Sequence, residues 1–184
     1  MIAAWIALGV IALFLVIILG YYNRFAVLKN RIENSSAQID VQLKKRSDLV
    51  PNLVEATKGY MKHEKEMIKT VTDARKSLIC AKDMNQKIKA GDALGNAIGR
   101  LFALAENYPN LKANENFIEL QRELTSIEDK VAYARQFYND SVLEYDNLRS
   151  TFPGNMFAGL FGRNEEQYLK IEESERKPVK VKFD

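Results

Sequence analysis

The first 20 residues of the chain carry no charged, amide or hydroxyl side chain. An α-helix of about 20 residues rises about 30 Å, which matches the hydrocarbon layer of a bilayer, and it bonds its own backbone polar groups. Few other structures can hold such a segment, because water solvates it poorly on every side. The run therefore predicts a membrane-spanning anchor at residues 1–22, and the soluble part of the chain follows it.

The flanks of this run distinguish an anchor from a cleaved signal peptide. A signal peptide has a basic segment before a shorter apolar stretch and small residues at its far end. Here no Lys or Arg precedes the run, and the small pair Ala3 and Ala4 lies at its start. Trp5 on one side and Tyr21 and Tyr22 on the other occupy the positions of interfacial aromatic residues. We interpret the run as a retained anchor; a cleaved signal and a buried core helix are the alternatives.

Basic residues follow the run and do not precede it. Arg24, Lys29 and Arg31 all lie shortly after its end. Segments rich in Lys and Arg stay on the cytoplasmic side of a membrane. We therefore expect the N-terminus outside and the C-terminal domain in the cytoplasm, with Arg24 at the inner interface.

The balance of charges argues against nucleic acid as a partner. The chain has 27 basic and 24 acidic residues, which leaves a net charge of only +3. Domains that bind nucleic acids concentrate basic residues on one surface. The densest basic cluster here, Lys44 to Arg46, is interpreted as a solvated helix face.

The residues that catalysis or metal binding would need are scarce. Cys80 is the only cysteine and His63 the only histidine, which excludes an intramolecular disulfide, a paired-histidine metal site and most thiolate sites. The chain has no glycine-rich phosphate loop and no serine elbow bracketed by glycines. We therefore predict no enzyme activity, no metal and no cofactor.

Apolar residues spaced three and four apart predict helices through most of the soluble part. A first stripe runs from Phe25 to Leu43, and no Gly or Pro separates it from the anchor. A helix accepts proline only near its start, and Asp or Ser can cap that start. The sequence therefore predicts a helix break formed by Asp48, Pro51 and Asn52.

The remaining helices are predicted in the same way. One runs from about Pro51 to Ala90 and ends at Gly91 and Asp92, and a short one carries the stripe from Leu94 to Ala105. The longest pattern, from Phe117 to Leu148, continues for more than four heptads. Matching stripes in the same chain favour an intramolecular antiparallel bundle over a self-associating coiled coil. The predicted fold class is all-α: an N-terminal transmembrane helix followed by an antiparallel long-helix bundle at residues 23–163.

The C-terminal part begins with a short apolar segment punctuated by glycines. Its large side chains are Phe152, Met156, Phe157, Leu160 and Phe161. They either contact a partner or the membrane surface, or form a lid over one end of the bundle. Residues 164–184 are predicted to be a charged, extended tail. Its alternating end either adds a strand to a partner or frays.

Several short runs along the chain have a characteristic identity and spacing. They include, in chain order, Tyr22-Asn23-Arg24, Ala37-Gln38-Ile39-Asp40, Asp48-Leu49-Val50-Pro51-Asn52, Tyr108-Pro109-Asn110-Leu111, Phe137-Tyr138-Asn139 and Phe152-Pro153-Gly154-Asn155. In combination these runs resemble those of the LemA family of bacterial membrane-anchored helical proteins. The resemblance covers nearly the whole chain. It implies one transmembrane helix, a long-helix bundle and no established enzymatic activity. Ser35, Ser36 and Ser47 stand where the family more usually has bulkier or aromatic residues, which affects local packing.

These features predict a single-pass, membrane-anchored helical scaffold or adaptor in the bacterial inner membrane. Its expected partners are the lipid bilayer and either copies of itself or other proteins. The alternatives are a lipid- or ligand-responsive sensor that uses the segment from Met156 to Phe161, and an accessory enzyme with an unrecognised site.

Overall fold

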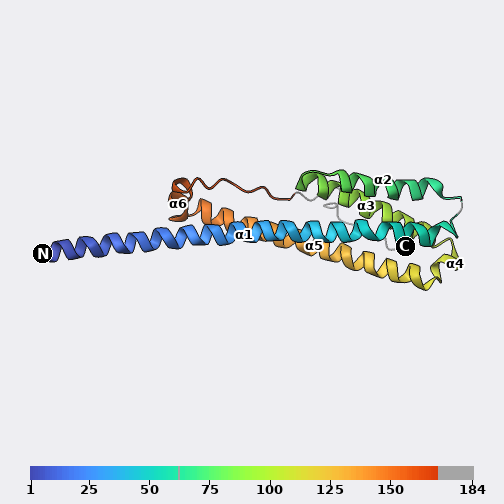
Figure 1. The fold of residues 1–184 in the computed structure, drawn as a ribbon, viewed down its shortest axis with the longest axis horizontal. Coiled ribbons are helices and arrows are strands. Elements are labelled where there is room, and N and C mark those ends of the chain that lie inside the picture. Colours follow the sequence, from blue (N-terminus) through green and yellow to red (C-terminus); the bar gives the residue numbers. More distant parts are fainter. Residues whose placement is uncertain (62, 170–184) are drawn as a thin grey trace, which may run out of the picture. The chain divides into compact units, whose positions relative to one another are not determined.

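The chain is helical throughout most of its described length. The computed structural model describes residues 1–61 and 63–169 (Figure 1). Its helices are α1 (Ile2–Lys58), α2 (Lys65–Cys80), α3 (Met84–Ala105), α4 (Pro109–Lys112), α5 (Glu115–Ser150) and α6 (Gly154–Leu160). No strand occurs within these described residues. The predicted all-α fold with an N-terminal apolar helix is confirmed.

The helices form two compact units, and α1 and α5 contribute to both. The first, here called the anchor unit, consists of Met1–Ile32 and the described residues from Tyr138 onward. The second, the central unit, consists of Glu33–Phe137. The alternating end of the predicted tail, in residues 177–183, lies outside the described residues.

The central unit has a core to which α1, α2, α3, α4 and α5 contribute, α4 with Leu111 alone. In Figure 1, α2 and α3 lie side by side, and they pack against each other. Most of the buried side chains are aliphatic and recur at helical spacing, as burial of one face per helix requires. They include Ile39, Leu43, Val50 and Leu53 from α1, Val71 and Leu78 from α2, Leu94 and Leu101 from α3, and Ile127 and Val131 from α5.

The predicted helix break at Asp48, Pro51 and Asn52 is wrong, because α1 continues through all three residues to Lys58. Pro51 has no N–H, so it cannot donate the helical bond to the carbonyl of Ser47. The side chain of Arg75, on α2, donates to that carbonyl from Nε at 2.8 Å. A neighbouring helix therefore supplies the donor that the proline lacks.

The predicted helix from Pro51 to Ala90 is also wrong, because α2 and α3 are separate helices. Asp83 caps α3, since its carboxylate accepts a hydrogen bond from the N–H of Gln86 at 2.8 Å. Gly91 lies inside α3 and does not end it. A Cβ atom at Gly91 would lie 2.7 Å from Cδ2 of Leu43, so glycine allows α1 and α3 to approach closely.

The long helical pattern from Phe117 to Leu148 is confirmed as α5. Asn114 caps it, because its side-chain oxygen accepts from the N–H of Phe117 at 3.1 Å. The stripe is buried almost throughout, with Leu120 half-buried. It packs within each unit, so the described chain already covers the stripe that a self-associating coiled coil would need.

Candidate membrane-proximal site and core charge cluster

The apolar run forms the first part of α1 and remains uncovered by the rest of the described chain. It is the one helix there that is long and apolar enough to cross a membrane, with a mean hydropathy of 3.0 and no buried residue in its most apolar window. Trp5 is 74% exposed. A core helix would be covered by its own protein, so this exposure argues against that alternative.

An aromatic cluster follows the run directly. The ring of Tyr21 stacks on Phe157 of α6 with centroids 4.6 Å apart, and Tyr22 meets Phe161 edge to face at 5.4 Å. Phe25, one turn further along α1, is fully buried and also contacts Phe161. Each such aromatic pair contributes about 0.5–1.5 kcal/mol beyond the burial of its area. The cluster therefore fixes α6 against α1 at the first turn after the apolar run.

The short helix α6 has two different faces. Phe157 is buried, and with Phe161 it forms the part of the predicted contact segment that packs on α1. Phe152, Met156 and Leu160 are 79%, 65% and 68% exposed. Part of the segment therefore packs on α1 and the other part is exposed, and the predicted contact with a partner or the membrane surface stays a prediction.

Two glycines fix the position of α6. A Cβ atom at Gly154 would lie 2.0 Å from the carbonyl oxygen of Leu148, so only glycine fits where α6 begins. At the other end Gly162 has a φ of 61°, the left-handed conformation that favours glycine. The N–H of Gly162 donates to Gly159, and that of Arg163 donates to Ala158, which is a Schellman arrangement. Both ends of α6 are therefore held by the backbone.

The chain then returns along α5 as an extended segment, residues 163–169, here called the strap. The amide of Asn139 binds both backbone groups of Leu169: it accepts from the N–H at 2.9 Å and donates to the carbonyl at 3.2 Å. The hydroxyl of Tyr138 donates to the carbonyl of Gln167 at 3.1 Å. The sequence predicted an extended tail from residue 164 but not its attachment to α5, since Asn139 and Tyr138 bind backbone atoms of the strap, which every residue offers.

Charged residues strengthen the attachment of the strap to α1, within the anchor unit. Glu166 forms an ion pair with Lys29 of α1. Burial raises the pKa of Tyr138 and of Tyr145, the carboxylate of Glu166 raises both further, and Lys29 opposes this effect. Both hydroxyls therefore stay protonated at neutral pH.

The central unit contains a cluster of charges around a buried arginine, which the sequence analysis did not predict. The side chain of Arg46 is only 1% exposed, forms an ion pair with Glu128, and donates from Nη1 to the carbonyl of Gly91 at 3.1 Å. Beside it, Arg135 is paired with Asp92. The pKa of Arg46 is lowered to about 10, chiefly by burial and also by the charge of Arg135, whereas Asp92 opposes this effect. The guanidinium remains charged at neutral pH because this pKa is still well above 7.

The interpretation of Lys44 to Arg46 as a solvated face is therefore wrong for Arg46. Lys44 and Lys45 are exposed, but Arg46 lies three residues after Leu43 and four before Val50, on the buried stripe of α1. The charge of an arginine suggested that the side chain is exposed to solvent, whereas its spacing from Leu43 and Val50 indicated that it lies in the core.

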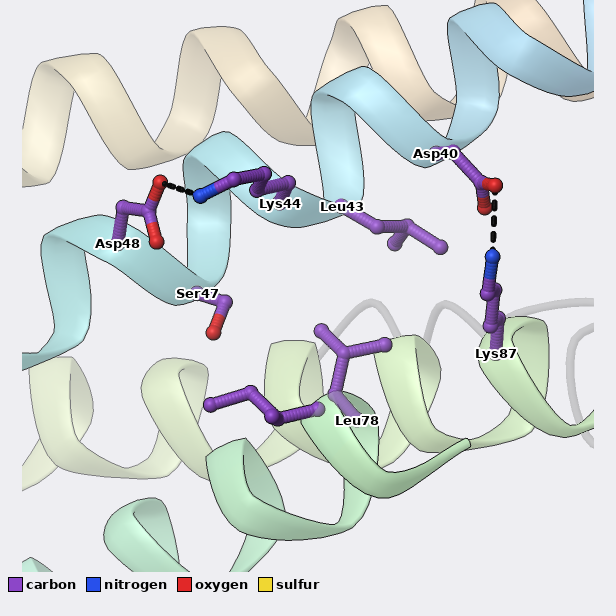
Figure 2. Close-up of a pocket in the computed structure, with 8 residues that line it drawn as sticks. Asp40, Leu43, Lys44, Ser47, Asp48, Leu78 and Lys87 are labelled. Atoms are coloured by element: carbon purple, nitrogen blue, oxygen red, sulfur yellow. Dashed lines mark hydrogen bonds and ion pairs between the residues drawn. The ribbon is translucent and has the colours of Figure 1, made fainter. Parts of the chain in front are cut away.

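A surface groove of about 450 Å³ lies between α1, α2 and α3. Figure 2 shows Leu43 and Leu78 pointing toward one another in it, with an ion pair on either side. Lys44 contacts Asp48 at 2.7 Å and Lys87 contacts Asp40 at 2.6 Å. Its charges are paired with each other, so the groove presents an apolar floor between neutralised edges.

Residues 35–183 match the sequence model of the LemA family. The chain belongs to the LemA family. A protein LemA of Metamycoplasma hominis is 23% identical over 174 residues, which cover 90% of this chain and 80% of that protein. The magnetosome protein MamQ of Magnetospirillum gryphiswaldense is 25% identical over 192 residues, 89% of this chain and 71% of that protein. The magnetosome protein MamQ 2 of Paramagnetospirillum magneticum is 23% identical over 198 residues, which cover 94% of this chain and 72% of that protein.

Several residues of the LemA-like runs make contacts with residues far away in the sequence. Asp40 pairs with Lys87, and Asn139 holds the strap. The hydroxyl of Tyr108 donates to Glu64 at 3.0 Å. Polar side chains of these runs therefore connect distant parts of this LemA-family chain.

The residues with catalytic potential are dispersed in the described part of the LemA-family chain. His63 and Cys80 are both exposed, and neither belongs to a group of three or more metal-binding side chains among residues 1–61 and 63–169. The most concentrated charges, around Arg46, are occupied with one another. The geometry is that of a helical structure with an exposed apolar end.

Proposed function

We propose that this LemA-family protein is a single-pass membrane anchor that carries a non-enzymatic helical scaffold. One observation carries the proposal: the exposed apolar part of α1 continues without interruption into the part that packs in the central unit. The anchor would hold the scaffold at the membrane, where it is presented to partners or to copies of itself.

The packing of Tyr21 and Tyr22 supports retention of the anchor. Both residues immediately follow the apolar run, and both contact rings of α6. Cleavage near the end of the run would remove the helical turn on which these contacts depend. An anchored product of full length in isolated membranes is therefore expected, and a shortened, soluble product would contradict the proposal.

The proposed orientation in the bacterial inner membrane places the N-terminus outside and the central unit in the cytoplasm, as Arg24, Lys29 and Arg31 favour. Cys80 is a natural reporter, because it is the only cysteine in the sequence and it is exposed. A membrane-impermeant maleimide should label it only after the cells are opened. A variant carrying Cys80→Ser and Ile2→Cys is the matched control and should be labelled in intact spheroplasts. Labelling of Cys80 in intact spheroplasts would overturn the orientation.

Self-assembly or partner recruitment can be tested in native membranes. An anchor confines the scaffold to two dimensions, which raises its local concentration and lets weak contacts become effective. Crosslinking before solubilisation, followed by mass measurement in detergent, should yield a defined homo-oligomer or a reproducible partner. A monomer without a partner would contradict the scaffold proposal.

A lipid-responsive sensor is the second candidate, and the exposed side of α6 is the observation that favours it. Such a sensor needs an apolar surface that reaches the bilayer, and this requirement leads to the inference below.

A further inference from the structure

We propose that α6 makes a second contact with the bilayer that α1 spans. The contact surface, called the α6 patch, consists of Phe152, Met156 and Leu160. It would lie in the headgroup region beside the anchor, with its side chains directed toward the acyl chains. The inference rests on the proposed function, since it requires α1 to be inserted in the membrane.

The position of α6 along α1 is the first argument. Tyr21 is the residue directly after the apolar run, and its ring stacks on Phe157 at 4.6 Å. An α-helix rises about 1.5 Å per residue, so α6 lies within about one helical turn of the end of the run. Interfacial helices bury their apolar face about 5–10 Å into the boundary between headgroups and acyl chains. The α6 patch is therefore at the depth where such a helix binds.

The chemistry of the patch is the second argument. Residues Gly154–Leu160 contain no charged side chain. Met156 and Leu160 are four residues apart on α6 and Phe152 lies two residues before the helix; they are 65%, 68% and 79% exposed, respectively. A cluster of large apolar side chains in water is unfavourable and marks a contact surface. The bilayer is the occupant that the structure favours, because the patch adjoins the exposed apolar run.

Basic side chains accompany the patch, as expected at the headgroups. Arg24 is exposed on the turn of α1 after Tyr21. The guanidinium of Arg163, directly after α6, lies 5.7 Å from the centroid of the Tyr22 ring. Arginine can bind lipid phosphates while an aromatic ring at the same level packs against it. Both residues can therefore pair with phosphates without moving the patch.

The fixed position of α6 gives this contact a function. Three features hold α6 against the rest of the anchor unit: Gly154, the turn at Gly162 and the strap. A single helix can rotate about its axis in a membrane, and its tilt follows from its packing and its interfacial anchors. A second contact on one side of α1 restricts that rotation. The α6 patch would thereby determine which side of the anchor unit faces the membrane surface.

The test uses the full-length chain in vesicles of phosphatidylcholine and phosphatidylglycerol. In a Cys80→Ser background, single cysteines replace Met156, Leu160, Leu15 or Tyr168 and carry a polarity-sensitive NBD fluorophore. Vesicles with doxyl-labelled acyl chains quench fluorophores that reach the lipid. Met156 and Leu160 are exposed, so their replacement leaves the core intact.

Tyr168 provides the matched control. It is 42% exposed and belongs to the strap, next to Leu169, which Asn139 holds. Asn139 is six residues before Tyr145 on α5, and Tyr145 contacts Phe25. Six residues correspond to about 9 Å along the helix, so this control lies further from the apolar run than the patch does.

The expected result is loss of emission at positions 156 and 160 comparable to the loss at position 15, with no loss at position 168. Quenching at 15 without quenching at 156 and 160 would overturn this inference and leave the anchor proposal standing. Absence of quenching at 15 would overturn the anchor proposal itself. Protection of 156 and 160 from aqueous iodide without doxyl quenching would show that protein covers the patch, which also overturns the inference.

Discussion

The hydrogen bond from Arg75 to the carbonyl of Ser47 should be a measurable source of stability, and its value should depend on Pro51. The guanidinium donates at 2.8 Å to the carbonyl that the missing N–H of Pro51 leaves without its helical donor. Replacing Arg75 with Ala leaves that carbonyl without a protein donor in α1. Replacing Pro51 with Ala restores the N–H, so the loss of Arg75 then matters less.

The free energy that this hydrogen bond contributes can be estimated from the charge of its donor. Hydrogen bonds that involve a charged group contribute about 1.5–3 kcal/mol, and Arg75 is half-buried, which places it at the lower end. We expect Arg75→Ala to cost about 1.5 kcal/mol in the natural chain and about 0.5 kcal/mol in a Pro51→Ala background. The coupling free energy is the difference, about 1 kcal/mol. For a chain of this size, 1 kcal/mol shifts the Tm by about 2–4 °C.

The assay is a double-mutant cycle on the full-length chain in one detergent. Thermal unfolding is followed by far-UV circular dichroism for the natural chain, Arg75→Ala, Pro51→Ala and the double variant. Lys76→Ala is the control, because Lys76 is the exposed neighbour of Arg75 on α2. Equal losses of Tm from Arg75→Ala in the two backgrounds would refute the reasoning, since the bond would then be independent of the proline.

Three further predictions concern single residues, each tested by thermal unfolding. Gly154→Ala should cost about 3 kcal/mol, because its Cβ would lie 2.0 Å from the carbonyl oxygen of Leu148, whereas Gly159→Ala, where nothing lies within 4 Å, should not destabilise. The pKa of Tyr145 is raised in the folded state, so the folded chain holds more protons above pH of about 10 and stability falls as pH rises through that range. Tyr145→Phe should reduce this alkaline loss, and an unchanged pH profile would contradict the assignment. Arg46→Met should stay within about 1 kcal/mol of the natural chain, because it removes the buried charge and keeps most of the volume, whereas Arg46→Ala should cost about 3 kcal/mol.

The sequence predicted the parts of the fold that depend on local periodicity. The stripe from Phe117 to Leu148 became a single helix, and the stripe from Phe25 to Leu43 is buried as expected. In both, large apolar residues spaced three and four apart define most of the buried face, and the small Ser35 and Ser141 fill the remaining positions. The signal that separates α2 from α3 was also present, because Asp83 followed by Gln86 three residues later is a helix-start pattern. It was outweighed by a stripe that continued across the break.

The error at Pro51 has a different cause. A proline inside a helix is unfavourable because it removes one donor and crowds the preceding turn, and both effects are local. The compensating donor, Arg75, lies on another helix, and no local rule connects the two positions. The strap has the same property: Asn139 recognises the backbone of Leu169, which any residue there would offer. Contacts of this kind are set by tertiary packing and are invisible to periodicity.

The buried Arg46 depends on glycines of α3. A Cβ atom at Gly95 would lie 3.2 Å from Nη1 of Arg46 and 3.2 Å from a carboxylate oxygen of Glu128, so a larger residue would press on the ion pair. The preceding glycine of the same helix, Gly91, accepts a hydrogen bond from Arg46 through its carbonyl. Glycines spaced four apart on one helix indicate that another helix approaches closely there. Here the space they leave holds a guanidinium, so the glycines at 91 and 95 and the arginine at 46 form one structural unit, and an Ala at Gly95 should disturb the charge cluster before it disturbs the helix.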